Sequence, residues 1–278
     1  MSELENRLRQ RVKTLLEEGT VAYFIGWGPL WHGEGTKPLF VHSPDQADRL
    51  VYNDSCVHSL AKYALDDRWP DGRIGICVRG CDARAVERMV TDKQIRREDL
   101  YLIGLPCEGM GMPVCASCIH SVPGGCDEMM GDPAGHVPTQ SRFAAVDALE
   151  SMTSENRYAF WEGQFAKCIH CYACRNVCPA CNCRECYLDK ARTGWEGKRS
   201  DSARNGIYGL TRAFHVGDRC IECGQCERVC PMDIPVMSLT SKVLKDINSL
   251  FGSYECGLPD SRPNILGQFD LNDADEFE

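Results

Sequence analysis

Cysteines recur with one spacing, twice, between residues 168 and 230. The two runs are Cys168-x₂-Cys171-x₂-Cys174-x₃-Cys178-Pro179 and Cys220-x₂-Cys223-x₂-Cys226-x₃-Cys230-Pro231. This spacing is typical of the thiolate ligands of two [4Fe–4S] clusters, in which the fourth cysteine of each run binds the cluster of the other run. Three thiolates on one tight loop bind three irons of a cubane, and the fourth iron needs a ligand from elsewhere. The expected ligands are Cys168, Cys171, Cys174 and Cys230 for the first cluster, and Cys220, Cys223, Cys226 and Cys178 for the second.

Zinc and disulfides are the alternatives for these cysteines. A single C-x₂-C pair would suit zinc, whereas two complete four-cysteine runs, each followed by proline, suit it poorly. The chain has 19 cysteines, opens on polar residues without an apolar signal sequence, and contains no apolar stretch of membrane-spanning length. We therefore expect the protein to lie in the reducing cytoplasm, where metal or cluster binding is favoured over disulfides. Oxygen-sensitive clusters in such number also predict a role in anaerobic metabolism.

Length and charge limit the classes of function. The 278 residues are enough for two domains. The net charge of −9 argues against nucleic-acid binding, which needs clustered Lys and Arg. Acidic residues gather near the C-terminus, and residues 256–278 are expected to form a solvated acidic tail.

The first half of the chain has the pattern of a small α/β domain over residues 1–140. Leucines and valines at helical spacing predict an amphipathic helix in the first twenty residues. Short apolar runs predict strands over residues 21–25, 39–41, 73–78 and 100–105, and helical spacing predicts helices over 57–65 and 83–90. This alternation predicts a sheet that is at least partly parallel. Residues 110–139 are rich in Gly, Pro and Cys and are expected to form loops.

The second half, residues 141–255, is predicted to be helical around the two cysteine runs. Helices are expected near residues 142–150 and from an N-cap at Thr153 or Ser154, with Tyr158, Trp161 and Phe165 directed inward. A further helix is expected to carry Ile207, Leu210 and Phe214 on one face, and another follows Pro235. The predicted fold class is therefore α+β: a small α/β domain followed by an α-helical two-cluster domain.

Helices rather than hairpins flank the runs, and this resembles the α-helical ferredoxin domain of succinate dehydrogenase iron–sulfur subunits and of C-type heterodisulfide reductase subunits. The segment Cys220-Ile-Glu-Cys223-Gly-Gln-Cys226-Glu-Arg-Val-Cys230-Pro-Met-Asp-Ile carries the resemblance. It implies two clusters at electron-tunnelling separation and no substrate site of their own.

Further cysteines follow the predicted strands of the first half. Cys56, Cys81 and Cys107 stand just past strand ends, where open α/β sheets bind ligands, and Cys115 and Cys118 follow on a loop. Helix N-termini at that edge favour an anionic, thiolate-ligated cluster. We therefore expect a third [4Fe–4S] cluster with Cys56, Cys81, Cys107 and one or both of Cys115 and Cys118 as ligands. The alternative is that some of these are buried free thiols.

Other candidate ligands stay open. Cys181, Cys183 and Cys186 either bind a further metal, completed by Cys256 or a histidine, or pack around the first cluster and tune its potential. Cys77, in the middle of a predicted strand, is expected to be a core thiol, and Cys126 is left unassigned. His170 is expected to lie at the surface or behind the ligands.

The loops around Cys81 and Cys107 resemble those of electron-input subunits of hydrogenases, formate dehydrogenases and heterodisulfide-reductase-like complexes. Some of these relatives, the beta subunits acting on coenzyme F420, bind a flavin. The glycines Gly26, Gly28, Gly33 and Gly35 do not form a G-x-G-x-x-G fingerprint, which argues against an FAD site.

The sequence thus predicts a non-catalytic subunit that relays single electrons through [4Fe–4S] clusters within a multisubunit cytoplasmic redox complex. The expected partners are a flavoprotein, a formate dehydrogenase, a hydrogenase or a heterodisulfide-reductase-like subunit. The alternatives are a flavin-bearing oxidoreductase subunit that accepts electrons from F420 or NAD(P)H, and a zinc-stabilised interaction module.

Overall fold

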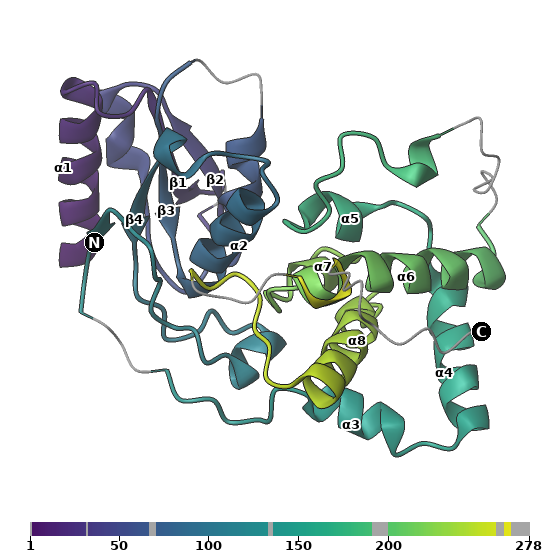
Figure 1. The fold of residues 1–278 in the computed structure, drawn as a ribbon. Coiled ribbons are helices and arrows are strands. Elements are labelled where there is room, and N and C mark those ends of the chain that lie inside the picture. The colour runs from purple at the N-terminus through teal and green to yellow at the C-terminus, as the bar shows by residue number, and fades with distance from the viewer. Residues whose placement is uncertain are drawn as a thin grey trace, which may run out of the picture.

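A five-stranded sheet with its helices lies beside a group of helices that carries both cysteine runs (Figure 1). The structure, a computed structural model, describes residues 2–31, 33–66, 71–132, 136–190, 200–259 and 264–267. The predicted α+β class is confirmed. The expected acidic tail falls largely outside the described residues.

The sheet has the strand order β2-β1-β3-β4-β5. Its strands are β1 (Tyr23–Pro29), β2 (Thr36–Val41), β3 (Ile74–Val78), β4 (Leu100–Gly104) and β5 (Glu128–Met129). β1 pairs with β2 antiparallel, and β1, β3, β4 and β5 are parallel neighbours. The four predicted strands and the partly parallel sheet are confirmed, whereas the short β5 was not predicted.

Helices cover this sheet. α1 (Glu3–Glu17) begins with a capping box between Ser2 and Glu5 and buries Leu8, Val12 and Leu15, as its spacing predicts. α2 (Gly80–Thr91) follows β3 directly. The described chain also contains short 3₁₀ helices: Pro44–Arg49, Ala61–Leu65, Arg97–Asp99, Pro113–Ser117, Tyr187–Asp189, Gly217–Arg219 and Ile265–Gly267.

The helix predicted over residues 57–65 is wrong, because only its last turn, Ala61–Leu65, is helical. Backbone carbonyls at its start accept hydrogen bonds from the side chains of Arg79, Trp27 and Gln225. Since these carbonyls bond to distant side chains, they are not available to amides four residues on.

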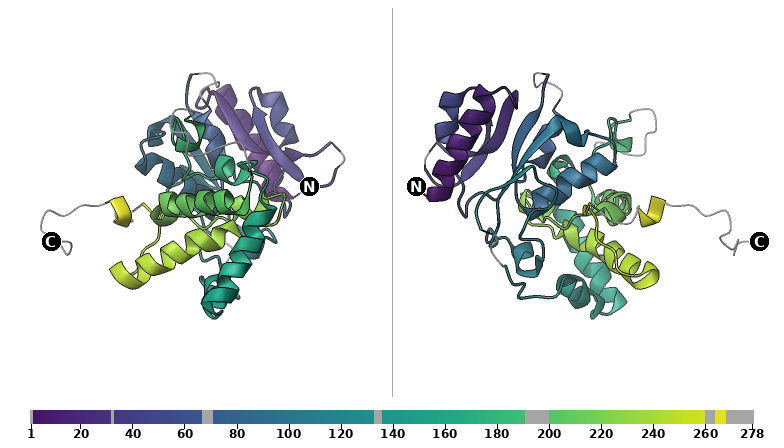
Figure 2. Two further views of the ribbon diagram at one scale, coloured as in Figure 1. Left: turned by 90° about the vertical axis from the view of Figure 1, so that its right-hand side faces the viewer. Right: turned by 60° about the vertical axis from the view of Figure 1, so that its left-hand side comes forward.

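The remaining helices are α3 (Ala144–Glu150), α4 (Ser154–Lys167), α5 (Ala173–Val177), α6 (Ser202–Val216), α7 (Gln225–Arg228) and α8 (Val236–Phe251). Thr153 caps α4 by accepting from the Asn156 amide, as predicted. Figure 2 shows α4, α6 and α8 on the side of the molecule away from α1. None of the described helices has the length and apolar character needed to cross a membrane.

The apolar face predicted for α6 lies at the surface, and the predicted inward face of α4 is wrong at Tyr158. Ile207, Leu210 and Phe214 are 61%, 50% and 63% exposed, and on α4 Tyr158 is 70% exposed, although Phe165 is buried as predicted. The buried face of α6 carries the polar Asn205, Tyr208 and Arg212 as well as Ala213 and Val216. The three polar side chains contact the cysteine loops, so polar groups line the interior around these loops.

One hydrophobic core runs through both halves of the chain. Ile221, Leu244 and Ile247 pack into the same core as the sheet. The segment after α8 returns to α2, where the buried Arg84 donates to the carbonyl of Cys256 at 3.0 Å. The two parts are therefore packed together rather than joined only by a linker.

Candidate metal centres

Cys168, Cys171, Cys174 and Cys230, here called the first thiol set, line one small cavity. The first three stand on the loop between α4 and the end of α5, and the fourth follows α7. Burial and then the neighbouring thiolates of Cys174, Cys171 and Cys230 raise the pKa of Cys168. The structure thus brings together the four cysteines expected to bind the first cluster.

The second thiol set consists of Cys178, Cys220, Cys223 and Cys226. Burial and then the thiolates of Cys178 and Cys226 raise the pKa of Cys223 well above its ordinary value. For Cys220, burial, Glu222 and the same two thiolates raise the pKa. The four cysteines expected to bind the second cluster are therefore neighbours too.

Both runs fold with the same local backbone. His170 and Tyr172 in the first run have φ values of 54° and 56°, and Glu222 and Gly224 occupy the equivalent places in the second with 56° and 69°. Left-handed backbone at a non-glycine residue costs about 1–3 kcal/mol and persists where the surroundings impose it. In the second run, this turn lets the amide of Glu222 donate to the sulfur of Cys220 at 3.4 Å. A thiolate or cluster ligand gains charge stabilisation from such amides.

Cys81, Cys107, Cys115 and Cys118 form a third thiol set at the carboxyl edge of the sheet. Cys81 stands in the first turn of α2, Cys107 follows β4, and Cys115 and Cys118 belong to the 3₁₀ turn and its end. Burial and Asp82, and then the thiolates of Cys107 and Cys118, raise the pKa of Cys81 to about 12, against the lowering effect of Arg79. Backbone amides donate to two of these sulfurs, that of Gly109 to Cys107 at 3.4 Å and that of Met110 to Cys115 at 3.5 Å.

Cys56, also expected in this group, is not brought into it. It is fully buried in the core, where its sulfur faces the backbone of Asn53 and Val51. Both Cys115 and Cys118 belong to the set, whereas the sequence did not decide between one of them and both. In the described part of the chain, no group of three or more His, Cys, Asp or Glu side chains converges as the ligands of a single metal ion do. The ligands of a [4Fe–4S] cluster do not converge on one metal ion, because each of them binds a separate iron.

Residues 164–234 match a family model described as a 4Fe-4S dicluster domain. We refer to this segment, by its similarity to that family, as the dicluster domain. It spans all eight cysteines of the first and second thiol sets, so the predicted [4Fe–4S] clusters and the identification as an iron–sulfur electron-transfer protein are confirmed. The third thiol set lies outside the dicluster domain.

Three curated proteins are similar to part of this chain. The F420-dependent formate dehydrogenase subunit beta of Methanocaldococcus jannaschii is 38% identical over 106 residues, which is 38% of this chain and 27% of that protein. Subunit beta of F420-dependent formate dehydrogenase 1 of Methanococcus maripaludis is 41% identical over 109 residues, again 38% and 27% of the two chains. Acetyl-CoA decarbonylase/synthase complex subunit alpha 1 of Methanosarcina acetivorans is 28% identical over 98 residues, 35% of this chain and 10% of that protein. The match spans about a quarter of the length of the first two relatives.

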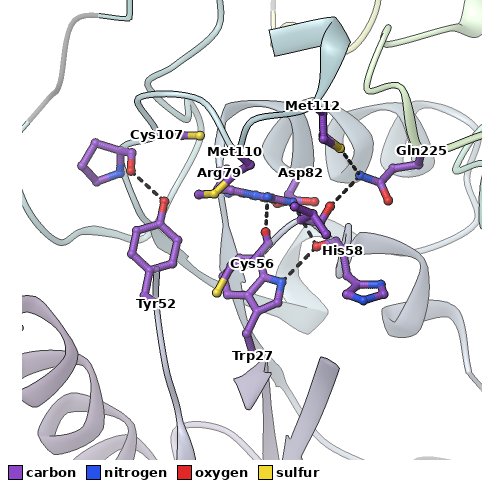
Figure 3. Close-up of polar contacts among 12 residues, drawn as sticks. Trp27, Tyr52, Cys56, His58, Arg79, Asp82, Cys107, Met110, Met112 and Gln225 are labelled. Atoms are coloured by element: carbon purple, nitrogen blue, oxygen red, sulfur yellow. Dashed lines mark hydrogen bonds and ion pairs between the residues drawn. The ribbon is translucent and has the colours of Figure 1, made fainter. Parts of the chain in front are cut away.

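A buried arginine stands beside the third thiol set (Figure 3). Arg79 is 1% exposed, donates to Asp82 at 2.7 Å and to the carbonyl of His58 at 2.9 Å, and lies over the ring of Trp27 at 5.0 Å. Burial alone would lower the pKa of Arg79, but Asp82 and the thiolates of Cys81 and Cys107 hold it above its ordinary value. Arg79 is thus a permanent positive charge next to this set.

The dicluster domain packs on the loops of the third thiol set. Gln225, between two cysteines of the second set, donates to the carbonyl of Val57 at 2.7 Å and points toward Met112 (Figure 3). Lys62 donates to the carbonyls of Cys178 at 3.0 Å and Cys181 at 2.8 Å. These bonds fix the second set relative to the sheet.

The remaining cysteines have distinct surroundings. Cys77 is fully buried within β3 and Cys256 beneath α2, where Arg88 reaches its sulfur at 3.9 Å. Cys181 hydrogen-bonds with Cys178, which lowers the pKa of the Cys178 thiol. Cys183 is exposed, and Cys126 is half-buried.

The basic residues around these sets were not predicted from the sequence. Lys62 and Arg212 are far in sequence from the cysteines that they approach in space, whereas Arg79 stands two residues before Cys81. A polar stripe at helical spacing on α6, residues 205, 208 and 212, was the one signal available, because it faces opposite to the apolar stripe.

Proposed function

We propose that this chain is the electron-relay subunit of a multisubunit redox complex, and that it passes single electrons through three [4Fe–4S] clusters held by the three thiol sets. Each set offers four cysteine sulfurs, and all of these cysteines except the exposed Cys171 are partly buried. Backbone amides donate to sulfurs of the second and third sets. This donor chemistry fits the cluster. Bound [4Fe–4S] clusters supply one-electron redox chemistry and require no bond in a substrate to form or break.

The position of the second thiol set carries the proposal. Burial raises the pKa of Cys226, and among the charges acting on it are the thiolates of Cys178 and of Cys174, a member of the first set. The pKa of Cys223 is raised by burial, by its own set and also by the thiolate of Cys81, a member of the third set. The second set therefore neighbours both others, an arrangement that supports transfer in series.

An apolar surface next to the first set supports the assignment to a complex. Ile207, Leu210 and Tyr158 border a groove of about 750 Å³ between α4, α6 and α8. The groove shares Phe165 and Leu239 with the cavity of the first set. Contiguous exposed apolar surface of this kind marks interaction sites. Electrons would enter or leave the chain here, through a partner seated beside the first set.

The partner is proposed from the relatives. Two of them are beta subunits of F420-dependent formate dehydrogenases, and a third belongs to an acetyl-CoA decarbonylase/synthase complex. We propose a cytoplasmic complex of the formate dehydrogenase, hydrogenase or heterodisulfide-reductase-like class, with a flavoprotein or catalytic subunit as the partner. We also propose that the sheet-bearing part ends near residue 140 and that the two-cluster part extends to about residue 255.

Iron and acid-labile sulfide per chain, measured on anaerobically purified protein, test the three-cluster relay. About twelve irons and twelve sulfides are expected for the natural chain, and about eight of each for Cys115→Ser/Cys118→Ser. Cys183→Ser, an exposed cysteine outside the three sets, is the matched control and retains about twelve. Eight irons per chain in all three proteins would contradict the proposed third cluster. Stoichiometric zinc without iron would contradict the proposed role in electron transfer.

A further inference from the structure

Arg212 is a buried cation inside the dicluster domain. It projects from the inward face of α6 and is 7% exposed. Its Nη2 donates to the carbonyl of Cys174 at 3.2 Å, and its Nε has no hydrogen-bond partner among the described residues. The neighbouring polar residues of the same face contact the same loop: Tyr208 meets the Cys174 sulfur at 3.5 Å, and Asn205 donates to the Cys168 carbonyl at 3.0 Å.

The guanidinium lies between the first and second thiol sets. Burial alone would lower its pKa, but the thiolates of Cys178, Cys226, Cys181 and Cys174 hold the pKa of Arg212 well above its ordinary value. Cys174 belongs to the first set, and Cys178 and Cys226 belong to the second. Arg212 also lines both the cavity of the first set and a second cavity of about 470 Å³ on the side of Cys181.

A buried charge of this kind requires compensation. An isolated ion in the interior is strongly unfavourable, and Arg212 pairs with no Asp or Glu among the described residues. The negative charge available to it is that of the cysteine ligands on either side. An arginine also keeps its charge at every accessible pH, so its effect on its neighbours is constant.

We propose that Arg212 sets the reduction potentials of the first and second centres together, by balancing the negative charge that each gains when it takes up an electron. This inference rests on the proposed function, because it requires clusters in both sets. A nearby buried cation stabilises the more negative, reduced form, so Arg212 raises both potentials.

The test is an anaerobic redox titration, followed by electron paramagnetic resonance, of the natural chain and Arg212→Met. At a fixed potential, the ratio of reduced to oxidised centres should fall at least tenfold for both the first and second centres, which corresponds to a downward shift of about 59 mV for a one-electron couple. The centre of the third set, with Arg79 beside it, should keep its potential. Arg204→Met, a half-exposed arginine on the same helix, is the matched control and should shift neither.

Iron content separates failure of this inference from failure of the proposed function. If the natural chain binds no iron, the proposed function fails. If Arg212→Met holds its full iron and both potentials stay at their natural values, the assignment of Arg212 is overturned. If Arg212→Met loses iron, Arg212→Gln and Arg212→Lys decide: a fall in both potentials for Gln but not for Lys supports a role of the charge, and equal potentials in the two overturn it.

Discussion

Gly224 and Val114 are in direct contact across the boundary between the dicluster domain and the sheet. A methyl group at the Cα of Gly224 would lie 2.6 Å from Cγ1 of Val114. Gly224 stands among the cysteines of the second thiol set, and Val114 immediately precedes Cys115 of the third. The two sets are therefore held together by a contact that leaves no room for a side chain.

Gly224→Ala should separate these loops. The new methyl group overlaps Val114, and the φ of 69° disfavours any residue with a Cβ. We expect the free energy of unfolding to fall by about 1–3 kcal/mol, measured by denaturant unfolding of the anaerobic protein. Gly163→Ala, in α4 with open space around it, is the control and should be neutral or stabilising by about 0.5–1 kcal/mol. Equal effects of the two variants would show that the contact is unimportant.

Arg79→Met should destabilise the edge of the sheet that carries the third thiol set. The substitution leaves Asp82 buried without its partner, and breaking a buried ion pair costs about 3–5 kcal/mol. Denaturant unfolding should show this loss, and iron analysis should show fewer irons at the third set. Arg96→Met removes a fully exposed arginine paired with Asp99, and no measurable change is expected. An Arg79→Met chain as stable as the Arg96→Met chain would refute the role given to the buried pair.

Lys62→Met should weaken the attachment of the second thiol set. The Lys62 ammonium donates to the carbonyls of Arg175, Cys178 and Cys181 at 3.4, 3.0 and 2.8 Å. Charged hydrogen bonds of this kind contribute about 1.5–3 kcal/mol, and the unfolding free energy should fall by that amount. The control is Lys13→Met, which removes a surface ion pair with Asp48 and should change stability by no more than about 0.5 kcal/mol.

Asp127 should stabilise the fold at neutral pH and lose this effect as the solution becomes acidic. Burial alone would raise the pKa of Asp127, but the Leu102 amide, Arg97 and Arg73 outweigh it and hold the pKa below its ordinary value. A lowered carboxyl pKa gives stability that is complete above the ordinary value, about 4, and is lost as pH falls through the folded value. The difference in unfolding free energy between the natural chain and Asp127→Asn should therefore be constant from about pH 8 to pH 5 and shrink below about pH 4. A difference that disappears between pH 8 and pH 5 would contradict this account of the carboxylate.

Much of the fold could be predicted because local patterns determine it. The strands and α1 follow from apolar periodicity, and the start of α4 follows from a capping side chain at Thr153. The grouping of Cys230 with the first run, across more than fifty residues, followed from the complementary spacing of the two runs and is seen in the structure as a shared cavity.

The errors arose where distant residues decide the local structure. The helix over residues 57–65 failed because Arg79 and Gln225 take its carbonyls, and no pattern within those residues announces that. The buried side of α6 could not be predicted, because periodicity shows that a helix is amphipathic and not which side faces the interior. In this protein the buried side faces thiols, so Arg212 lies inside and Phe214 outside. Cys56 was grouped with the third set from its place after a strand, although the structure turns its sulfur into the core.

Spin quantitation of the fully reduced chain is the most direct test of a relay in which the second centre stands between the other two. Electron paramagnetic resonance of the dithionite-reduced natural chain should integrate to about three spins, one for each reduced cluster, with line broadening from magnetic interaction between neighbours. Cys115→Ser/Cys118→Ser should integrate to about two, with the interaction that involves the second centre reduced. Two spins in both proteins, with identical spectra, would contradict the three-centre relay.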